Sequence, residues 1–403
     1  MVTIQAGENV ECTITNMAVM PSLTLNKVVV NGTTGALYSA SDWSLSATGP
    51  TEVADVTSGT KTFVKAGTYT LSESGPLGYS ASTWDCGDAT VVDGEVAVPL
   101  GHDVVCTVTN TAIAPTLTLN KVVDNGQTGA THTVADWSLS ASGPTSISGV
   151  ASGTKSTVKV GSYSLSESGP AGYAASNWNC TSASVVDNVV TVQLGHDVVC
   201  TVTNTATSSS LTLVKSVDNG QTGATHTASD WELSASGPTA ISNVTSGTKT
   251  TVKIGHYTLS ESGPDGYTAS VWNCGDATVV DGVVEIELGD DVTCTVTNVA
   301  KHSSLTLNKV VLNGDTGATF APEDWALSAS GPTTISNVTS GTKTTVKIGS
   351  YTLAEAGPAG YTSSSWDCGD ATVVDGVVSV SLGQDVVCTI TNTATMPSLT
   401  LNK

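Results

Sequence analysis

The stretch SLTLNKVVVNG at residues 22–32 decides how this chain folds, because apolar and polar residues alternate in it before an Asn-Gly pair. A period of two is typical of a β-strand with one buried face, and Asn-Gly is a strong signal for a tight turn. Leu23 and Leu25 share a face with Lys27 in such a strand. The pattern therefore predicts a lysine that points into an apolar core.

The same stretch returns at a constant interval of 94 residues. The lysine recurs at Lys121, Lys215, Lys309 and Lys403, and five cysteines, Cys12, Cys106, Cys200, Cys294 and Cys388, have the same period. A fixed period indicates tandem copies of one structural unit. We interpret 1–20 as the C-terminal strands of a preceding truncated repeat, 21–112, 115–206, 209–300 and 303–394 as four whole repeats, and 395–403 as the first strand of a following truncated repeat. On this interpretation the chain is a section of a longer array.

Each repeat has the pattern of an all-β domain. Some seven short runs of alternating residues are separated by Gly-Pro, Asp-Gly and Asn-Gly turns, and no segment has a sustained helical period. This pattern predicts an antiparallel, Ig-like β-sandwich of about 90 residues. We expect the tandem array to form an elongated rod, with Pro21, Pro115 and Pro397 stiffening three of the joints.

The charge of the chain excludes several classes of partner. It carries 35 acidic and 14 basic residues, all of the latter lysine, for a net charge of −21. This balance argues against binding to nucleic acid or to an anionic membrane, and no apolar run is long enough to insert into a bilayer. The expected partners are neighbouring repeats of the same long chain and other copies in a fibre, and any further ligand is unknown.

Three polar residues of each repeat are predicted to face inward. In the first repeat they are Lys27, Glu73 in YTLSE and Asn110 in CTVTN. A buried lysine or glutamate is costly alone, and a buried ion pair only about breaks even. A covalent bond resolves this cost: a neutral lysine attacks the asparagine carboxamide, glutamic acid moves the protons, and ammonia leaves. The alternative is a buried hydrogen-bonded triad without a bond.

The motif YTLSESGPLGY at 69–79, with the lysine before it and the asparagine after it, resembles the E-box of CnaB-type domains. These SpaA-like, or prealbumin-like (transthyretin-like), isopeptide-forming repeat domains occur in surface proteins of Gram-positive bacteria. The resemblance covers all four repeats and implies a prealbumin-like fold. It also implies that the E-box glutamates catalyse the bond, namely Glu73, Glu167, Glu261 and Glu355. The implied isopeptide pairs are Lys27 with Asn110, Lys121 with Asn204, Lys215 with Asn298, and Lys309 with Asn392. The fourth E-box reads YTLAEAGPAGY, and the third lysine stands in LTLVK, so neither departure changes these residues.

Cysteines occur in pairs 20 residues apart, which we interpret as one disulfide in each repeat. The predicted pairs are Cys86 with Cys106, Cys180 with Cys200, Cys274 with Cys294, and Cys368 with Cys388, and Cys12 is left over. Zinc sites favour closely spaced Cys-x-x-Cys clusters, and a catalytic thiol needs a histidine that the repeats do not share. Disulfides indicate an oxidising, extracellular location, on a bacterial surface or in a secreted fibre.

Two tryptophans in each repeat have a possible binding role that core packing explains more simply. Trp84, Trp178, Trp272 and Trp366 stand two residues before a cysteine, and Trp43, Trp137, Trp231 and Trp325 follow an aspartate. Stacking on carbohydrate is the alternative. The acidic GDAT and VVDG segments could supply oxygens to calcium, but the second repeat reads TSAS and VVDN. We therefore predict no metal and no cofactor.

These features predict a structural protein. We expect the shaft of an extracellular fibre or cell-surface stalk, in which every repeat is locked by a self-catalysed Lys-Asn isopeptide bond and a disulfide. The bond forms once, so the chain is not expected to be a turnover enzyme. The alternative is a ligand-binding adhesin array on the bacterial surface, which would concentrate differences between repeats in one loop or face.

Overall fold

The computed structural model describes residues 1–400, so the expectation for Lys403 lies outside the described residues. Contacts divide the chain into two units. Unit 1 holds Met1–Asp124 and His132–Thr205, and unit 2 holds Asn125–Thr131 and the chain from Ala206 onward. Residues 1–20 contain no strand, and all of them are exposed.

Unit 1 contains the first two repeats. Repeat 1 consists of β1 (Ser22–Val30), η1 (Ala40–Asp42, a 3-10 helix), β2 (Ser44–Thr48), β3 (Val53–Val56), β4 (Thr60–Phe63), β5 (Gly67–Ser74), β6 (Tyr79–Ala81), β7 (Val91–Val92), β8 (Glu95–Val98) and β9 (Asp103–Ala112). Repeat 2 consists of β10 (Thr116–Asp124), η2 (Val134–Asp136), β11 (Ser138–Ser142), β12 (Ile147–Val150), β13 (Thr154–Thr157), β14 (Gly161–Ser168), β15 (Tyr173–Ala175), β16 (Asn179–Cys180), β17 (Val185–Val186), β18 (Val189–Val192) and β19 (Asp197–Ala206).

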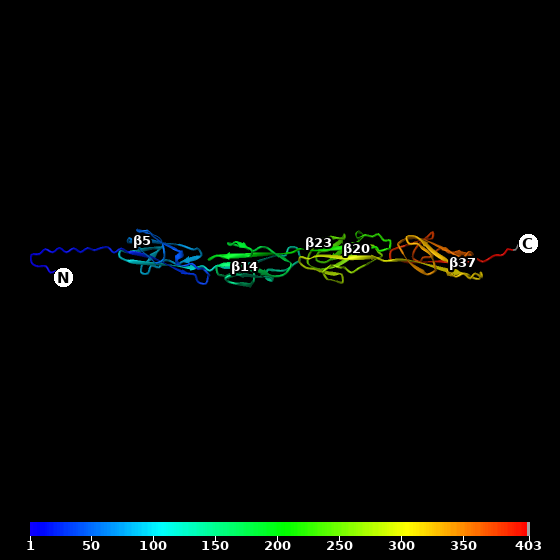
Figure 1. The fold of residues 1–403 in the computed structure, drawn as a ribbon, viewed down its shortest axis with the longest axis horizontal. Coiled ribbons are helices and arrows are strands. Elements are labelled where there is room, and N and C mark those ends of the chain that lie inside the picture. Colours follow the sequence, from blue (N-terminus) through cyan, green and yellow to red (C-terminus); the bar gives the residue numbers. More distant parts are fainter. Residues whose placement is uncertain (401–403) are drawn as a thin grey trace. The chain divides into compact units, whose positions relative to one another are not determined.

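Unit 2 contains the third and fourth repeats, in which β20, β23 and β37 are labelled in Figure 1. Repeat 3 consists of β20 (Ser209–Asp218), η3 (Ala228–Asp230), β21 (Glu232–Ser236), β22 (Ile241–Val244), β23 (Thr248–Val252), β24 (Gly255–Ser262), β25 (Tyr267–Ala269), β26 (Val279–Val280), β27 (Val283–Ile286) and β28 (Asp291–Ala300). Repeat 4 consists of β29 (Ser303–Leu312), η4 (Pro322–Asp324), β30 (Ala326–Ser330), β31 (Ile335–Val338), β32 (Thr342–Val346), β33 (Gly349–Ala356), β34 (Tyr361–Ser363), β35 (Val373–Val374), β36 (Val377–Val380) and β37 (Asp385–Ala394).

Every repeat is a sandwich of two sheets, which confirms the predicted all-β class. In repeat 1 the sheets have the strand orders β4-β1-β9-β6 and β3-β2-β5-β8-β7. The other repeats have the same two orders in their own strands, and repeat 2 adds β16 beside β19. The chain crosses between the two sheets several times, so residues far apart in sequence share one core.

One strand pair departs from the antiparallel pattern that the sequence predicts. β1 and β9 are parallel neighbours, with Lys27 opposite Val108, and the first and last strands of the other repeats pair in the same way. Parallel neighbours need a long crossover connection, and here the whole of the second sheet lies between them in sequence. The first strand therefore lies beside the last along nearly its full length.

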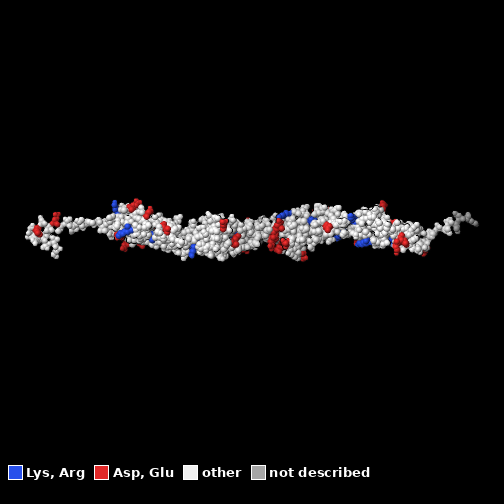
Figure 2. Space-filling view, in the orientation of Figure 1, with Lys and Arg blue, Asp and Glu red and all other residues white. Residues whose placement is uncertain are grey.

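The core of each repeat lies between the two sheets and is made by the alternation that the sequence predicts. Leu23 and Leu25 of β1, Tyr69 of β5 and Val96 of β8 are all fully buried in repeat 1. Charged side chains are sparse on the outside, and most of the visible face in Figure 2 is neither basic nor acidic. No helix among the described residues is long and apolar enough to cross a membrane.

Candidate functional site: a buried lysine, glutamate and asparagine

The three polar residues that the sequence places inward come from both sheets of the sandwich. In repeat 1, Lys27 of β1 and Asn110 of β9 lie in one sheet, and Glu73 of β5 lies in the other. The side chain of Lys27 has no exposed surface, and Asn110 is 5% exposed. The side chain of Glu73 is 15% exposed, so it is less buried than the sequence suggests.

The lysine amine contacts the glutamate carboxylate in all four repeats, which joins the two sheets across the core. Nζ of Lys27 donates a hydrogen bond to Oε2 of Glu73. The equivalent atoms are 2.6 Å apart in repeats 2 and 4. In repeat 3 the atoms of Lys215 and Glu261 are 2.8 Å apart, close enough for an ion pair but without hydrogen-bond geometry. The two residues of this contact are 46 apart in sequence, and the contact recurs every 94 residues.

The asparagine lies on the strand beside the lysine and leaves its carbonyl oxygen without a partner. Because Lys27 is opposite Val108 in the parallel register, Asn110 is its diagonal neighbour on the same face. Its Oδ1 atom is buried and accepts no hydrogen bond, and the same holds for Asn204, Asn298 and Asn392. A buried polar atom without a partner is rare and calls for an explanation.

Burial changes the acidity of the lysine. Desolvation lowers the pKa of Lys27, Lys121 and Lys215, and the close contact with the negatively charged partner glutamate only partly opposes this. Desolvation dominates because removal from water disfavours the charged ammonium. The neutral amine, which is the nucleophilic form, is therefore more accessible than in an ordinary lysine.

A tryptophan covers the amine, a contact that the sequence did not reveal. Nζ of Lys27 lies 4.9 Å from the ring centroid of Trp43, and the equivalent distance is 5.1 Å in the other repeats. The ring is 3% exposed and packs edge-on against Tyr79, with centroids 5.0 Å apart. Trp43 is therefore a core residue, as predicted, and its ring also separates the lysine amine from water.

A serine hydroxyl binds the backbone N–H of the lysine in each repeat, and this is a second contact that the sequence pattern did not predict. The hydroxyl of Ser58 accepts the N–H of Lys27 at 2.8 Å, and Ser152, Ser246 and Ser340 do the same in their repeats. Ser58 lies in the turn before β4, the strand that flanks β1. The tetrapeptide SGTK recurs with the 94-residue period, and this recurrence was the available signal.

The four predicted disulfides are present. They join Cys86 to Cys106, Cys180 to Cys200, Cys274 to Cys294 and Cys368 to Cys388. Each ties the segment after the sixth strand to the last strand, and in repeat 2 this segment contains β16. The nearby tryptophan, such as Trp84, packs against the same core. Cys12 is free and exposed.

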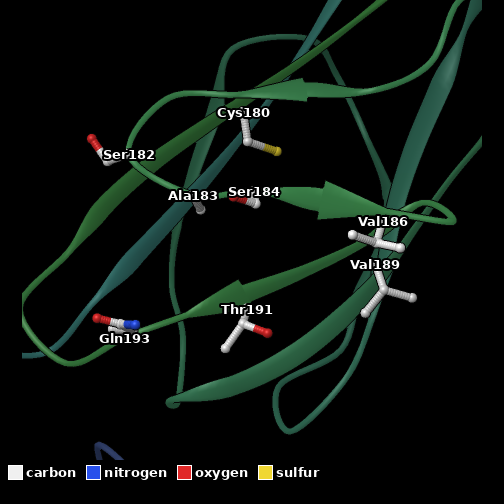
Figure 3. A pocket seen from close by; sticks show the side chains of 8 residues that line it. All are labelled: Cys180, Ser182, Ala183, Ser184, Val186, Val189, Thr191 and Gln193. Atoms are coloured by element: carbon white, nitrogen blue, oxygen red, sulfur yellow. The ribbon is translucent and has the colours of Figure 1, made fainter.

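A pocket beside the disulfide of repeat 2 offers no reactive group. Figure 3 shows it lined by Cys180, Ser182, Ala183, Ser184, Val186, Val189, Thr191 and Gln193. Cys180 is already bonded, and the remaining side chains are small or uncharged. The corresponding pocket of repeat 3 is instead acidic, with Asp276, Glu285 and Glu287 in its lining. Among the described residues, no three His, Cys, Asp or Glu side chains are grouped to hold a metal ion.

A comparison with models of protein families identifies the family of this chain. A family model described as a prealbumin-like fold domain of the SpaA type matches residues 20–108, 113–202, 206–296 and 300–390. The chain belongs to this family. Its four matches coincide with the four sandwiches, so the fold is four prealbumin-like repeats in tandem. No curated protein matches the chain.

Solved structures with similarity to these prealbumin-like repeats include a pilus adhesin and repeat units of a collagen-binding protein. The TIE protein of Bacillus anthracis is 16% identical, with a TM-score of 0.44, and the match covers 87% of this chain and 66% of that one. The pilus adhesin SpaC of Lactobacillus rhamnosus GG, in its open conformation, is 12% identical, with a TM-score of 0.24 and coverage of 81% and 55%. Two B repeat units of the collagen-binding protein of Staphylococcus aureus are 15% identical, with a TM-score of 0.18 and coverage of 94% and 100%. The chain thus spans less than two thirds of the first two proteins.

Proposed function

We propose that the chain is part of the shaft of an extracellular bacterial fibre or surface stalk, and that each repeat locks itself with a Lys-Asn isopeptide bond. The observation that carries the proposal is the buried, unpartnered Oδ1 of the asparagine, beside a lysine amine held by glutamate. Membership of the SpaA-type family and four disulfides support an extracellular location.

The arrangement supplies each part of the reaction in repeat 1. Transfer of a proton from Nζ of Lys27 to Glu73 gives a neutral amine beside a carboxylic acid. The amine attacks Cγ of Asn110 while the acid donates a proton to the carbonyl oxygen. This attack forms the Nζ–Cγ bond. The carboxylate then carries a proton from Nζ to Nδ2, and collapse of the tetrahedral intermediate breaks the Cγ–Nδ2 bond, returns the hydroxyl proton to the carboxylate and releases ammonia. One proton from the original ammonium remains on the carboxyl group, which balances the reaction.

The reaction runs once in each repeat, since its nucleophile is consumed. The expectation that the chain is not a turnover enzyme therefore remains part of this proposal. Trp43, which lies over the amine, excludes water and so favours attack by the amine over hydrolysis. No cofactor is needed, because the lysine, glutamate and asparagine supply the nucleophile, the acid and the electrophile.

The position of the bond suits a load-bearing shaft. Because β1 and β9 are parallel neighbours, tension that enters at the start of β1 and leaves at the end of β9 shears this pair. A bond from Lys27 to Asn110 spans the pair and bypasses residues 28–109. The disulfide between Cys86 and Cys106 lies inside the bypassed segment. It should carry no tension and should instead resist local opening.

A ligand-binding adhesin array is the alternative function. Such an array would concentrate the differences between repeats in one loop or face. The sequence differences here are few and are spread over outward positions and joints. This spread favours the shaft.

Intact mass measured with and without reductant tests the proposal. Four isopeptide bonds remove four molecules of ammonia, about 68 Da in total at about 17 Da each. Reduction of the four disulfides adds back only their hydrogens and leaves this deficit unchanged. A reduced mass equal to that of the unmodified chain would overturn the proposal. Lys155→Ala is the matched control, because this exposed lysine should not affect the deficit.

A further inference from the structure

Two glycines of repeat 1 lie against repeat 2 inside unit 1, and two glycines of repeat 3 lie against repeat 4 inside unit 2. Gly35 and Gly223 follow the first strand of their repeats, and Gly78 and Gly266 precede the sixth. All four have positive φ angles between +79° and +86°, which glycine adopts at no steric cost.

The first contact joins the loop after the first strand to a Lys-Val-Gly or Lys-Ile-Gly turn of the following repeat. The carbonyl of Thr34 accepts the N–H of Val160 at 2.8 Å, and that of Thr222 accepts the N–H of Ile348 at the same distance. A Cβ on Gly35 would lie 3.2 Å from Cβ of Lys159. Unit 2 repeats this contact between its segment 125–131 and Ile254, whose N–H donates to Thr128 at 2.8 Å.

The second contact is tighter and joins the E-box loop to a Leu-Gly turn of the following repeat. A Cβ on Gly78 would lie 2.6 Å from the carbonyl oxygen of Leu194, and a Cβ on Gly266 would lie 2.7 Å from Cβ of Leu382. Neither distance is compatible with a real side chain. Any residue other than glycine would push the following repeat away.

Repeat 4 carries the same two glycines in open space. Gly317 and Gly360 have φ angles of +82° and +89°, and a Cβ on either would meet no described atom within 4 Å. The loop around Gly360 is otherwise the same, because its carbonyl accepts the N–H of Thr395 as that of Gly78 accepts the N–H of Ile113. The positive φ therefore belongs to the loop, and the close approach belongs to the following repeat.

We propose that the two glycines form a docking surface that seats the N-terminal end of a following repeat of the same kind and fixes its orientation. The partner is recognised by its two turns, Lys-Val/Ile-Gly and Leu-Gly. The short linker holds the following repeat at a high effective concentration, which favours this contact. In unit 1 only residues 113–115 separate β9 from β10.

The joints then owe their stiffness to docking rather than to proline. The joint before β10 contains Pro115, whereas the joint before β29 has Ser303 at the first position of the strand. The Ser303 hydroxyl donates to the carbonyl of Ser381 at 2.8 Å and accepts the N–H of Gly383 at 3.0 Å. Both kinds of joint present the same glycine contacts.

Alanine substitution at matched glycines tests the docking surface. Gly78→Ala and Gly266→Ala introduce a Cβ into the contact, and Gly360→Ala introduces the same strain at nearly the same φ without a neighbour. In the 403-residue chain, hydrogen exchange of the peptides that contain Val160 and Ile348 reports the docked hydrogen bonds. We expect about tenfold faster exchange at Val160 in Gly78→Ala and at Ile348 in Gly266→Ala. Gly360→Ala should change neither.

Unchanged exchange in both contact variants would overturn the proposal, and so would equal acceleration in Gly360→Ala. A chain extended after Lys403 by a second copy of residues 122–206 sharpens the control. The added repeat carries both turns, so Gly360→Ala should now accelerate exchange at the added copy of Val160. These outcomes are independent of the isopeptide bond, because the cross-link lies within a repeat and the docking surface lies between repeats.

Discussion

Each repeat contains two ion pairs between lysine and a carboxylate, and they differ in burial rather than in distance. In repeat 2, Lys121 and Glu167 are 2.6 Å apart, and Lys155 and Asp197 are also 2.6 Å apart. The side chain of Lys121 has no exposed surface, whereas that of Lys155 is 55% exposed. The first pair joins the two sheets, and the second lies on the outside of one sheet.

The causes of the pKa shifts differ between the buried and the exposed pair. In the buried pair, desolvation lowers the pKa of Lys121 despite the carboxylate beside it. In the exposed pair, the hydrogen bond from Lys155 lowers the pKa of Asp197, and a hydrogen bond from Thr116 adds to this. Water screens the second pair, because both of its side chains are more than half exposed. The same contact distance thus accompanies a potential nucleophile in one place and a surface ion pair in the other.

The largest expected effect is on mechanical unfolding. Asn204→Ala removes the electrophile of repeat 2, so tension should now unfold that repeat, whereas the parent chain should show no unfolding step. The disulfide loop of 20 residues should shorten the length that the repeat gains when it unfolds, and reduction of the disulfide should restore that length. Single-molecule force spectroscopy measures both. An Asp197→Asn chain that also gained a step would show that the buried pair has no special mechanical role.

The next effect is on thermodynamic stability. Glu167→Ala should prevent the bond and leave Lys121 as a buried charge without its partner, which costs about 3–5 kcal/mol. Calorimetry should therefore show one of the four repeats melting well below the others. Lys155→Ala, which removes the exposed lysine, is the control and should leave all four transitions together. A Glu167→Ala chain that kept the full mass deficit would contradict the catalytic role of the glutamate.

The pH dependence separates the two pairs by range, because the folded pKa is lowered in both and stability therefore rises with pH in each window. In Asn204→Ala the lysine stays free, and its folded pKa lies below the unfolded value of about 10.4. The unfolded state then binds more protons between these two values, so stability should rise with pH through that window. For Asp197, whose folded pKa is also lowered, stability is present above about pH 3.9 and is lost as the pH falls through the folded pKa.

Melting temperatures across pH measure these two windows. Asn204→Ala combined with Lys121→Met should lose the alkaline rise and keep the acid loss. Asn204→Ala combined with Asp197→Asn should show the reverse. If both double variants followed the curve of Asn204→Ala alone, neither pair would govern the pH dependence.

The smallest effect is expected from the exposed pair at neutral pH. Asp197→Asn should lower the melting temperature only slightly, because exposed ion pairs are screened by water and salt. The difference from the parent chain should shrink further at high salt. A large, salt-independent loss would mean that this pair is as important to the fold as the buried one.

Much of the fold and most of the candidate site were predictable from residue pattern. Alternation in LTLNK placed Lys27 inward, and the same parity placed Asn110 inward, because a strand has a strict period of two. The spacing of 20 identified Cys86 and Cys106 as a pair, and the structure confirms it. The predicted strands in residues 1–20 are not formed in the structure, which shows no strand there.

Other features depend on contacts between segments that are distant in sequence. The ring of Trp43 lies over Lys27 only because η1 leads into the opposite sheet, and no local pattern encodes that crossing. The close approach of Gly78 to Leu194 likewise joins two repeats, and the motif around Gly78 does not reveal it.

The sequence by itself determined the repeat, the strands, the inward residues and the cysteine pairs, because each of these follows from periodicity along one chain. The tertiary structure alone decided that β1 and β9 are parallel, that the asparagine oxygen lacks a partner, and that tryptophan covers the amine. These facts require two sheets to pack face to face. The buried and exposed ion pairs differ for the same reason: sequence supplies the charges, and packing decides which of them keep their water.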